Sequence, residues 1–269
     1  MTRKQWTSEI IFTRLLNNKT QRTYWENIHE LRKRPNKKVY NQAFKLANSK
    51  TEKEKIIGIY VLAQLGSSPR FQQEKTVNLY FKLLENEKSP KIISAILSSI
   101  SHNNENLSDH QISKLIEFKN HTYSEVRLQT VLALSGLENH QAIITLIELS
   151  QDKFSDIRNW ATFGLGTQIE VDSAEITEAL WNRIKDEDQE TKFEAIVGLA
   201  NRSDSRIKEI IKRELINGEF GTLLFEAIET LNDNDFIPLL LKNLELSEND
   251  DRILDEWISD LKACINKLS

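Results

Sequence analysis

Apolar and small side chains recur along this 269-residue chain in a short segment that returns every 31 to 36 residues. The copies begin at Ile56, Ile92, Val126, Ile157, Thr191 and Leu223, and those at Ile92 and Leu223 match less well. In the copy that begins at Ile157, Ala161 follows four positions later and Gly164 three positions after that. Spacings of four and three place side chains on one face of a helix. Self-similarity at a fixed period therefore predicts six helical repeats.

Seven further stretches lie between or beside these segments, and their apolar residues also recur at three and four positions. They span residues 38–47, 72–84, 109–118, 141–149, 174–184, 206–215 and 236–244. Two more helices are predicted upstream, at residues 6–16 and 23–31. Small residues on one face of a helix let neighbouring backbones approach closely, as stacked repeats require. The pattern thus predicts helical hairpins that stack on one another.

The residues at the predicted helix ends agree with this division. The pairs Ser108-Asp109 and Asp172-Ser173 supply side-chain oxygens for the first free amides of a helix. Gly66, Gly136 and Gly166 occupy positions where helices are expected to stop, because glycine readily adopts the left-handed conformation of a helix end. Short turns between the helices follow from this arrangement.

The segment 151–166, QDKFSDIRNWATFGLG, resembles a HEAT repeat of the short bacterial type, also called the phycobilin-lyase HEAT-like repeat. Asp152 precedes Arg158 by six residues, and Asp186 precedes Lys192 by the same interval. The resemblance implies that these acidic and basic side chains form a ladder between stacked turns. Ile57 and Ile93 stand where the basic residue belongs, so we expect no ladder in the early repeats.

The resemblance implies an all-α fold, a right-handed α-solenoid of HEAT-like helical hairpins. It covers residues 120–200 best and residues 50–230 less well. We expect a single repeat domain over residues 1–269, with a divergent cap or first repeat at 1–50, core repeats at 51–232 and a C-terminal cap at 233–269. Proteins with such repeats mostly serve as protein-binding scaffolds, although a fold does not fix a function.

Composition supports long helices joined by short turns, because 8 Gly and 4 Pro are too few for many strands and hairpins. The one cysteine, Cys264, excludes an intrachain disulfide and suggests a reducing compartment, so we expect a cytoplasmic protein. The first residues lack the apolar stretch of a signal peptide, and no apolar run is long enough to span a membrane.

Charge is distributed unevenly along the chain. Residues 1–55 contain 14 Lys and Arg against 5 Asp and Glu, a balance of +9, which leaves −13 on residues 56–269. In a stacked array, position in the sequence becomes position along the long axis. The sequence therefore predicts a basic beginning and an acidic remainder.

No catalytic, metal or cofactor motif is recognisable. None of the five histidines is paired at three or four positions with another histidine or with the cysteine. The glycines Gly164 and Gly166 follow a helical period rather than a strand, which argues against a phosphate-binding loop. We therefore expect a protein that is not an enzyme and that uses no cofactor and no metal.

The candidate partner-binding site is centred on two aromatic residues. Trp160 and Phe163 lie three positions apart, beside the face that carries Ile157, Ala161 and Gly164. Exposed aromatics with a polar rim are typical of interface hot spots. The alternative is that both rings fill space between repeats, because large aromatics are more often buried than exposed.

Equivalent positions in the neighbouring repeats extend this site into a strip on the concave surface. The candidate partner-binding residues are Trp160, Phe163, Asn159, Arg158, Lys192, Glu194, Gln129 and Arg127.

A second candidate is the basic run at residues 32–38, RKRPNKK, which carries five positive charges in seven residues. Tyr24 and Trp25 precede it by one or two helical turns. Such a cluster suits phosphates or an acidic protein. The alternative is a solvated turn, because the later helices do not repeat the basic pattern that would track a nucleic-acid backbone.

The leading functional hypothesis is a monomeric cytoplasmic scaffold that binds a protein partner on its concave surface. One alternative is nucleic-acid recognition or repair, since some DNA alkyl-base glycosylases are built from HEAT-like repeats, although the balance of −13 opposes a nucleic-acid groove. A narrower alternative is a protein that neutralises a bacterial toxin, because an acidic surface suits a basic nuclease. Assistance to a bilin lyase rests on the name of the repeat alone.

Overall fold

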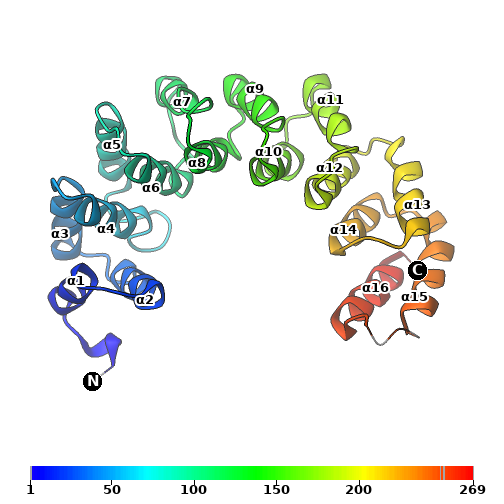
Figure 1. Ribbon diagram of the computed structural model, residues 1–269, viewed down its shortest axis with the longest axis horizontal. Coiled ribbons are helices and arrows are strands. Elements are labelled where there is room, and N and C mark those ends of the chain that lie inside the picture. Colours follow the sequence, from blue (N-terminus) through cyan, green and yellow to red (C-terminus); the bar gives the residue numbers. More distant parts are fainter. Residues whose placement is uncertain (1, 249, 251, 269) are drawn as a thin grey trace. The chain divides into compact units, whose positions relative to one another are not determined.

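The structure is a computed structural model that describes residues 2–248, 250 and 252–268. These residues form 16 α-helices and two short 3-10 helices, and no strand occurs among them. Successive helices alternate between two rows, so each pair of consecutive helices forms one hairpin (Figure 1). Within the described residues, no helix has both the length and the apolar character needed to cross a membrane.

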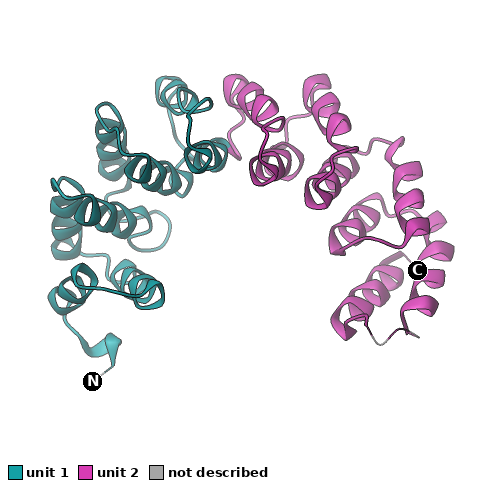
Figure 2. Cartoon of the chain, in the orientation of Figure 1, with its two compact units in different colours: residues 1–134 teal, residues 135–269 magenta. Residues whose placement is uncertain are grey.

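The chain divides into two compact units, residues 1–134 and residues 135–269 (Figure 2). In unit 1 a short 3-10 helix, Arg3–Gln5, precedes four hairpins. Their first-row helices are α1 (Ser8–Leu16), α3 (Lys37–Ala47), α5 (Gln73–Leu84) and α7 (Asp109–Ile116). Their second-row helices are α2 (Gln21–Arg32), α4 (Glu52–Ala63), α6 (Pro90–Ser101) and α8 (Ser124–Leu134).

Unit 2 also contains four hairpins. Its first-row helices are α9 (His140–Leu149), α11 (Ala174–Arg183), α13 (Ile207–Asn217) and α15 (Ile237–Glu248), the last preceded by the 3-10 helix Asn234–Phe236. Its second-row helices are α10 (Ser155–Thr167), α12 (Gln189–Asn201), α14 (Thr222–Leu231) and α16 (Asp255–Leu268). In each unit every second-row helix contacts the next one in its row, so the second row is continuous within each unit.

The predicted repeats match these helices. The six repeated segments lie in α4, α6, α8, α10, α12 and α14, and the seven intervening stretches lie in the first-row helices from α3 to α15. The two upstream helices correspond to α1 and α2, whereas α16 was not predicted. The division into an N-terminal cap, core repeats and a C-terminal cap stays a prediction.

Glycine lets second-row backbones touch in unit 2. A Cβ atom added to Gly198 of α12 would lie 2.6 Å from the Cα atom of Gly166 in α10 and 3.0 Å from a methyl group of Leu180. No side chain fits at such distances, so the two helices pack through bare backbone. The same principle joins α3 and α4 of unit 1, where a Cβ atom on Gly58 would lie 2.2 Å from the backbone nitrogen of Ala47.

The predicted helix ends are partly confirmed. Ser108 and Ser173 accept hydrogen bonds from backbone amides of the first turns of α7 and α11. Gly66 and Gly136 adopt positive φ angles of 85° and 77°, as helix-terminating glycines do. The expectation for Gly166 is wrong, because this residue lies inside α10 and is needed for close packing rather than for a turn.

Replacement of Gly198 by alanine should destabilise the protein, because the new methyl group must displace backbone atoms of α10. We expect Gly198→Ala to lower the free energy of unfolding by about 2 kcal/mol, despite the better helix propensity of alanine. The measurement is urea denaturation followed by circular dichroism. Gly221→Ala is the control, since nothing lies within 4 Å of its added Cβ atom and its φ is −105°. An equal effect of both substitutions would refute the packing explanation.

Candidate functional site

The aromatic pair predicted from the sequence lies on α10 of unit 2. Trp160 is 44% exposed, and its indole packs edge-to-face on the ring of Phe163, with 5.6 Å between centroids and an interplanar angle of 88°. Phe163 is half-buried. An aromatic ring fixed by its neighbour offers a partner a large contact area at little cost in conformational entropy. Trp160 therefore presents accessible aromatic surface instead of only filling space between repeats.

A hydrogen bond connects this pair to α12. Nδ2 of Asn159, the neighbour of Trp160, donates to Oε2 of Glu190 at 3.3 Å. The amide oxygen of Asn159 is buried and accepts no hydrogen bond from any described group. Buried polar atoms of this kind are rare in native proteins. The surface around Trp160 thus continues onto α12 through the Asn159–Glu190 hydrogen bond. The side-chain amide of Asn159 uses its nitrogen in this bond, while its oxygen has no partner.

A groove of about 630 Å³ lies next along this surface, between α12 and the start of α14. We call it the acidic groove, and its lining residues are Gln189, Glu190, Phe193, Glu194, Glu219, Phe220, Gly221, Thr222 and Leu223. Phe193 is buried beneath it, and Phe220 is held in place by Phe225 and Trp257, with centroid distances of 5.8 and 5.6 Å. The groove therefore combines an aromatic wall with three carboxylates.

The Glu194 carboxyl group lies in an environment that disfavours its charged form. Burial, followed by repulsion from Glu226 and Glu190, raises the pKa of its carboxyl group to about 7. No described residue forms a hydrogen bond or an ion pair with the Glu194 side chain. A carboxylate that is desolvated, surrounded by like charges and without a cation is stabilised by any positive group that enters the groove. The site is chemically suited to a lysine or arginine side chain.

Lys192 lies in sequence between Glu190 and Phe193, which line this groove, but its own partner lies on α13. Its Nζ atom lies 2.8 Å from Oε2 of Glu214 on α13, and both side chains are largely buried. Lys192 thus joins two helices of unit 2, and its charge is already compensated.

Arg158 likewise has a partner within the protein. Its guanidinium donates two hydrogen bonds to the carboxylate of Asp186, at 2.9 and 2.7 Å, and a third to the backbone oxygen of Asp152 at 3.0 Å. Arg183 also contacts Asp186, at 3.1 Å. The Arg158 side chain is only 9% exposed. This bidentate pair is the ladder contact that the HEAT resemblance implies.

The ladder also occurs in unit 1, contrary to expectation. Lys55 donates to Glu87 of the next repeat at 2.7 Å, and Glu87 accepts two backbone amides of the following turn at 3.0 Å. Asp186 accepts the amide of Asp188 in the same manner. The expectation was wrong because it required a basic residue at Ile57, whereas Lys55 reaches the same turn from two positions earlier.

The two remaining candidates lie on α8 of unit 1. Arg127 is buried, and its Nη1 atom donates to the backbone oxygen of His121 at 2.8 Å. Gln129 is half-buried and donates to Glu125 at 2.9 Å. Both belong to a different unit from Trp160, so the site described here consists of residues of unit 2 alone.

The sequence reasoning missed the aromatic wall of the acidic groove. Phe220 lies between Gly218 and Gly221 in the loop before α14, and Glu219 precedes it. An aromatic residue flanked by two glycines in a loop was the available signal.

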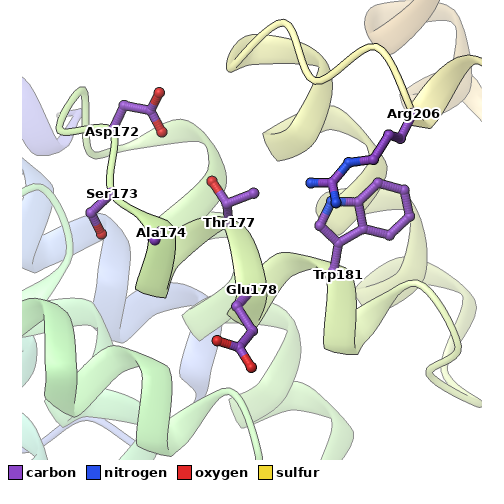
Figure 3. A pocket seen from close by; sticks show the side chains of 7 residues that line it. All are labelled: Asp172, Ser173, Ala174, Thr177, Glu178, Trp181 and Arg206. Atoms are coloured by element: carbon purple, nitrogen blue, oxygen red, sulfur yellow. The ribbon is translucent and has the colours of Figure 1, made fainter.

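A second pocket of unit 2 shows how similar residues serve structure. The Arg206 guanidinium lies over the Trp181 indole, 4.9 Å from its centre (Figure 3). Asp204 accepts a hydrogen bond from the indole nitrogen at 2.9 Å and also holds Arg206, and these bonds lower the pKa of its carboxyl group. Asp204 and Arg206 thus compensate each other, and the two carboxylates that line this pocket, Asp172 and Glu178, are exposed to solvent, unlike the desolvated Glu194 of the acidic groove. The described residues contain no group of three or more His, Cys, Asp or Glu that could hold a metal.

Removal of Asp186 should strongly destabilise unit 2, because it leaves the buried Arg158 without a counter-charge. We expect Asp186→Ala to lower the free energy of unfolding at pH 7 by about 3 kcal/mol or more. Glu187→Ala is the matched control, since its exposed carboxylate lies 3.8 Å from Arg158 and should contribute less than about 1 kcal/mol. Although burial opposes it, Arg158 lowers the pKa of Asp186, so this contribution should be lost only as the pH falls below about 4. Equal losses in both variants would contradict the ladder.

Glu194 should titrate near neutral pH. Carbon-detected NMR of the side-chain carboxyl should give a midpoint near the pKa of about 7, and Glu226→Gln should lower that midpoint by removing a like charge. Because the pKa is raised on folding, stability should fall as the pH rises toward and through 7. Glu194→Gln should therefore be more stable than the wild type at pH 8, and a midpoint near the ordinary value of 4.5 would refute the assignment.

Comparison with known proteins supports the fold. No protein-family model matches the chain. Escherichia coli YibA is 25% identical over 224 residues, which cover 82% of this chain and 79% of YibA. The X-ray structure of YibA superposes with a TM-score of 0.73 at 23% identity, covering 98% of this chain and 93% of that chain.

Two protein complexes contain more distant structural neighbours. The structure of Kap95p with RanGDP gives a TM-score of 0.59 at 10% identity, covering 97% of this chain and 41% of that chain. The complex of CpcE and CpcF of phycocyanin lyase from Nostoc sp. PCC7120 gives 0.50 at 14%, covering 98% and 96%. The all-helical repeat fold of the HEAT and armadillo kind predicted from the sequence is thus confirmed.

Proposed function

We propose that this protein is a non-catalytic scaffold that binds a basic protein partner through the second-row surface of unit 2. The proposal rests on one observation, the exposed Trp160 ring fixed on Phe163 beside a groove whose Glu194 carboxylate has no cation. The binding surface would consist of Trp160, Phe163, Asn159 and the acidic groove. Arg158 and Lys192 would support it from within, because their charges are paired inside the protein.

The chemistry of this surface suits a protein more than a small molecule. A rigid aromatic residue supplies contact area at the centre of an interface, and carboxylates beside it select a partner of opposite charge. A lysine or arginine of the partner entering the acidic groove would neutralise Glu194 and pack its aliphatic stem on Phe220.

The overall charge of unit 2 supports a basic partner. Unit 2 contains 14 Lys and Arg against 28 Asp and Glu, a balance of −14. The same charge disfavours the alternative of a DNA glycosylase on this surface, because nucleic-acid phosphates would be repelled. It favours the narrower possibility that the partner is a basic toxin that this protein neutralises.

The structural neighbours are compatible with a binding role. In the structure of Kap95p with RanGDP, binding of Kap95p induces the switch loops of RanGDP to adopt the GTP-bound conformation. For this chain we propose only the general role of binding a protein. The single cysteine, Cys264, is buried and free, which fits a reducing compartment. We therefore propose that the protein acts in the cytoplasm, and that it does so as a monomer.

The test is affinity capture from the native cell with quantitative mass spectrometry. A partner retained by the wild type should be reduced at least tenfold by the double variant Trp160→Ala and Phe163→Ala, because both aromatic surfaces are lost. Raised salt should weaken capture as well, since opposite charges attract the partner.

Leu241→Ala is the matched control for this experiment. Leu241 is 49% exposed, as Trp160 is, but lies on the first-row helix α15. The control should retain the partner, and circular dichroism should show unchanged helix content in all variants. Undiminished capture by the double variant would contradict the proposed site.

A further inference from the structure

A pocket of about 690 Å³ in unit 1 collects positive charge at the end of α2 and in the loop between α4 and α5. We call it the basic pocket, and its lining residues are His29, Arg32, Lys33, Pro35, Gln64, Gly66, Ser67, Ser68 and Arg70. No carboxylate lies among them. Unit 1 contains 22 Lys and Arg against 12 Asp and Glu, a balance of +10, so it has fewer carboxylates than cations to pair with them.

The structure separates the basic run predicted at residues 32–38 into two parts. Arg34 pairs with Glu30 at 2.6 Å, and Lys38 pairs with Glu9. Arg32 and Lys33 instead line the basic pocket, together with Arg70 from a distant part of the sequence. The sequence run itself is therefore not the site.

The two arginines of the basic pocket have only neutral partners. Arg32 donates from Nε to the backbone oxygen of Tyr60 at 2.9 Å and from Nη1 to the amide oxygen of Gln64 at 2.6 Å. Arg70 donates from Nη1 to the amide oxygen of Asn103 at 3.2 Å. Within the described residues, Nη2 of Arg32 and both Nε and Nη2 of Arg70 make no further hydrogen bond or ion pair. Most donors of Arg70 are left to a ligand or to water.

The charges also repel one another. Burial and, among the nearby charges, Arg70 lower the pKa of Arg32 to about 10. Loss of water around the ring, followed by repulsion from Arg32 and Arg70, lowers the pKa of His102, which follows α6. Both shifts mean that the positive forms lack a stabilising anion.

Hydrogen bonding to the carbonyl oxygens at helix ends does not account for the uncompensated positive charge of the basic pocket. Arg202 of unit 2 also follows a second-row helix, and its Nη1 and Nη2 atoms donate to five backbone oxygens at 2.7 to 3.4 Å. The carboxylate of Asp172 lies 3.8 Å from Arg202, and the arginine side chain is 7% exposed. Arg202 is thus an arginine with a structural role and a counter-charge. Arg70 has one side-chain hydrogen bond to a protein acceptor and no counter-charge, although it is half-buried.

We propose that the basic pocket binds a phosphate-type oxyanion, either as inorganic phosphate or as the phosphate group of a small phosphomonoester. Nε and Nη2 of Arg70 form an open planar fork that matches its oxygens, and Nη2 of Arg32 adds a further donor, with the Lys33 ammonium and the hydroxyls of Ser67 and Ser68 at the rim. A tetrahedral dianion offers more acceptor oxygens and more charge than a carboxylate, so it satisfies two guanidinium groups together. This site is independent of the partner surface, because it lies in unit 1 and has the opposite charge.

The experiment is NMR titration of the full chain at low salt with inorganic phosphate, adenosine monophosphate and acetate. We expect saturable binding of phosphate with a dissociation constant of about 1 mM or lower, and at least tenfold weaker binding of acetate. Tighter binding of adenosine monophosphate than of phosphate would identify a phosphomonoester as the ligand, and equal binding would identify the free ion. Bound phosphate should also raise the pKa of His102, because it compensates the nearby positive charges.

Variants on the same unit locate the binding site. Arg70→Gln should weaken phosphate binding at least tenfold, since it removes one fork. Arg22→Gln is the control, because Arg22 is exposed on α2 and is paired with Glu26. Helix content and thermal unfolding should show that both variants are folded, and Lys33→Gln offers a second test at an exposed position. Absence of phosphate binding at 10 mM, about ten times the expected dissociation constant, binding of acetate as strong as that of phosphate, or an unchanged affinity in Arg70→Gln would overturn the proposal.

Discussion

Direct backbone contact between second-row helices is the constraint on which the rest of unit 2 depends. Gly166 and Gly198 allow α10 and α12 to approach until no side chain fits between them. A hairpin with this packing cannot bury its apolar face alone, so each repeat needs its neighbour. The close approach also fixes which side chains remain on the surface. Trp160 is such a residue, and Glu194 lines the acidic groove half-buried, because the buried faces of α10 and α12 are occupied by their glycines and other packed side chains.

Ion pairs between repeats complement this contact and change the surface charge. Arg158 with Asp186 and Lys192 with Glu214 place two of the few cations of unit 2 within the protein. Buried pairs of this kind stabilise little in net terms, but they penalise any other register strongly, because a shifted repeat leaves a buried charge unpaired. A consequence is that the accessible surface beside Trp160 retains carboxylates. The acidity of the groove thus follows partly from how the repeats are held together.

The sequence predicted the helices well and the site incompletely, for physical reasons. Helical periodicity reports burial directly, so the repeated segments and their partner helices were found close to their observed bounds. Gly166 was misread because a glycine at a helix end and a glycine at a backbone contact look identical in one sequence. Lys55 was missed as a ladder residue because a flexible side chain reaches its partner from a different position. The raised pKa of Glu194 depends on burial and on Glu226, which is 32 residues away in the sequence.

The basic pocket and the acidic groove have the same kind of structure but carry opposite charges. In both, a loop after one helix and the end or beginning of another leave a recess in which like charges gather without a counter-charge. Elsewhere the chain compensates such charges, as Asp204 does for Arg206 and as backbone oxygens do for Arg202. Because a folded chain rarely leaves desolvated charges unpaired without a function, uncompensated recesses are better indicators of binding than charge counts along the sequence. The run at residues 32–38 demonstrates the difference, since two of its cations are internally paired and a residue outside it, Arg70, completes the pocket.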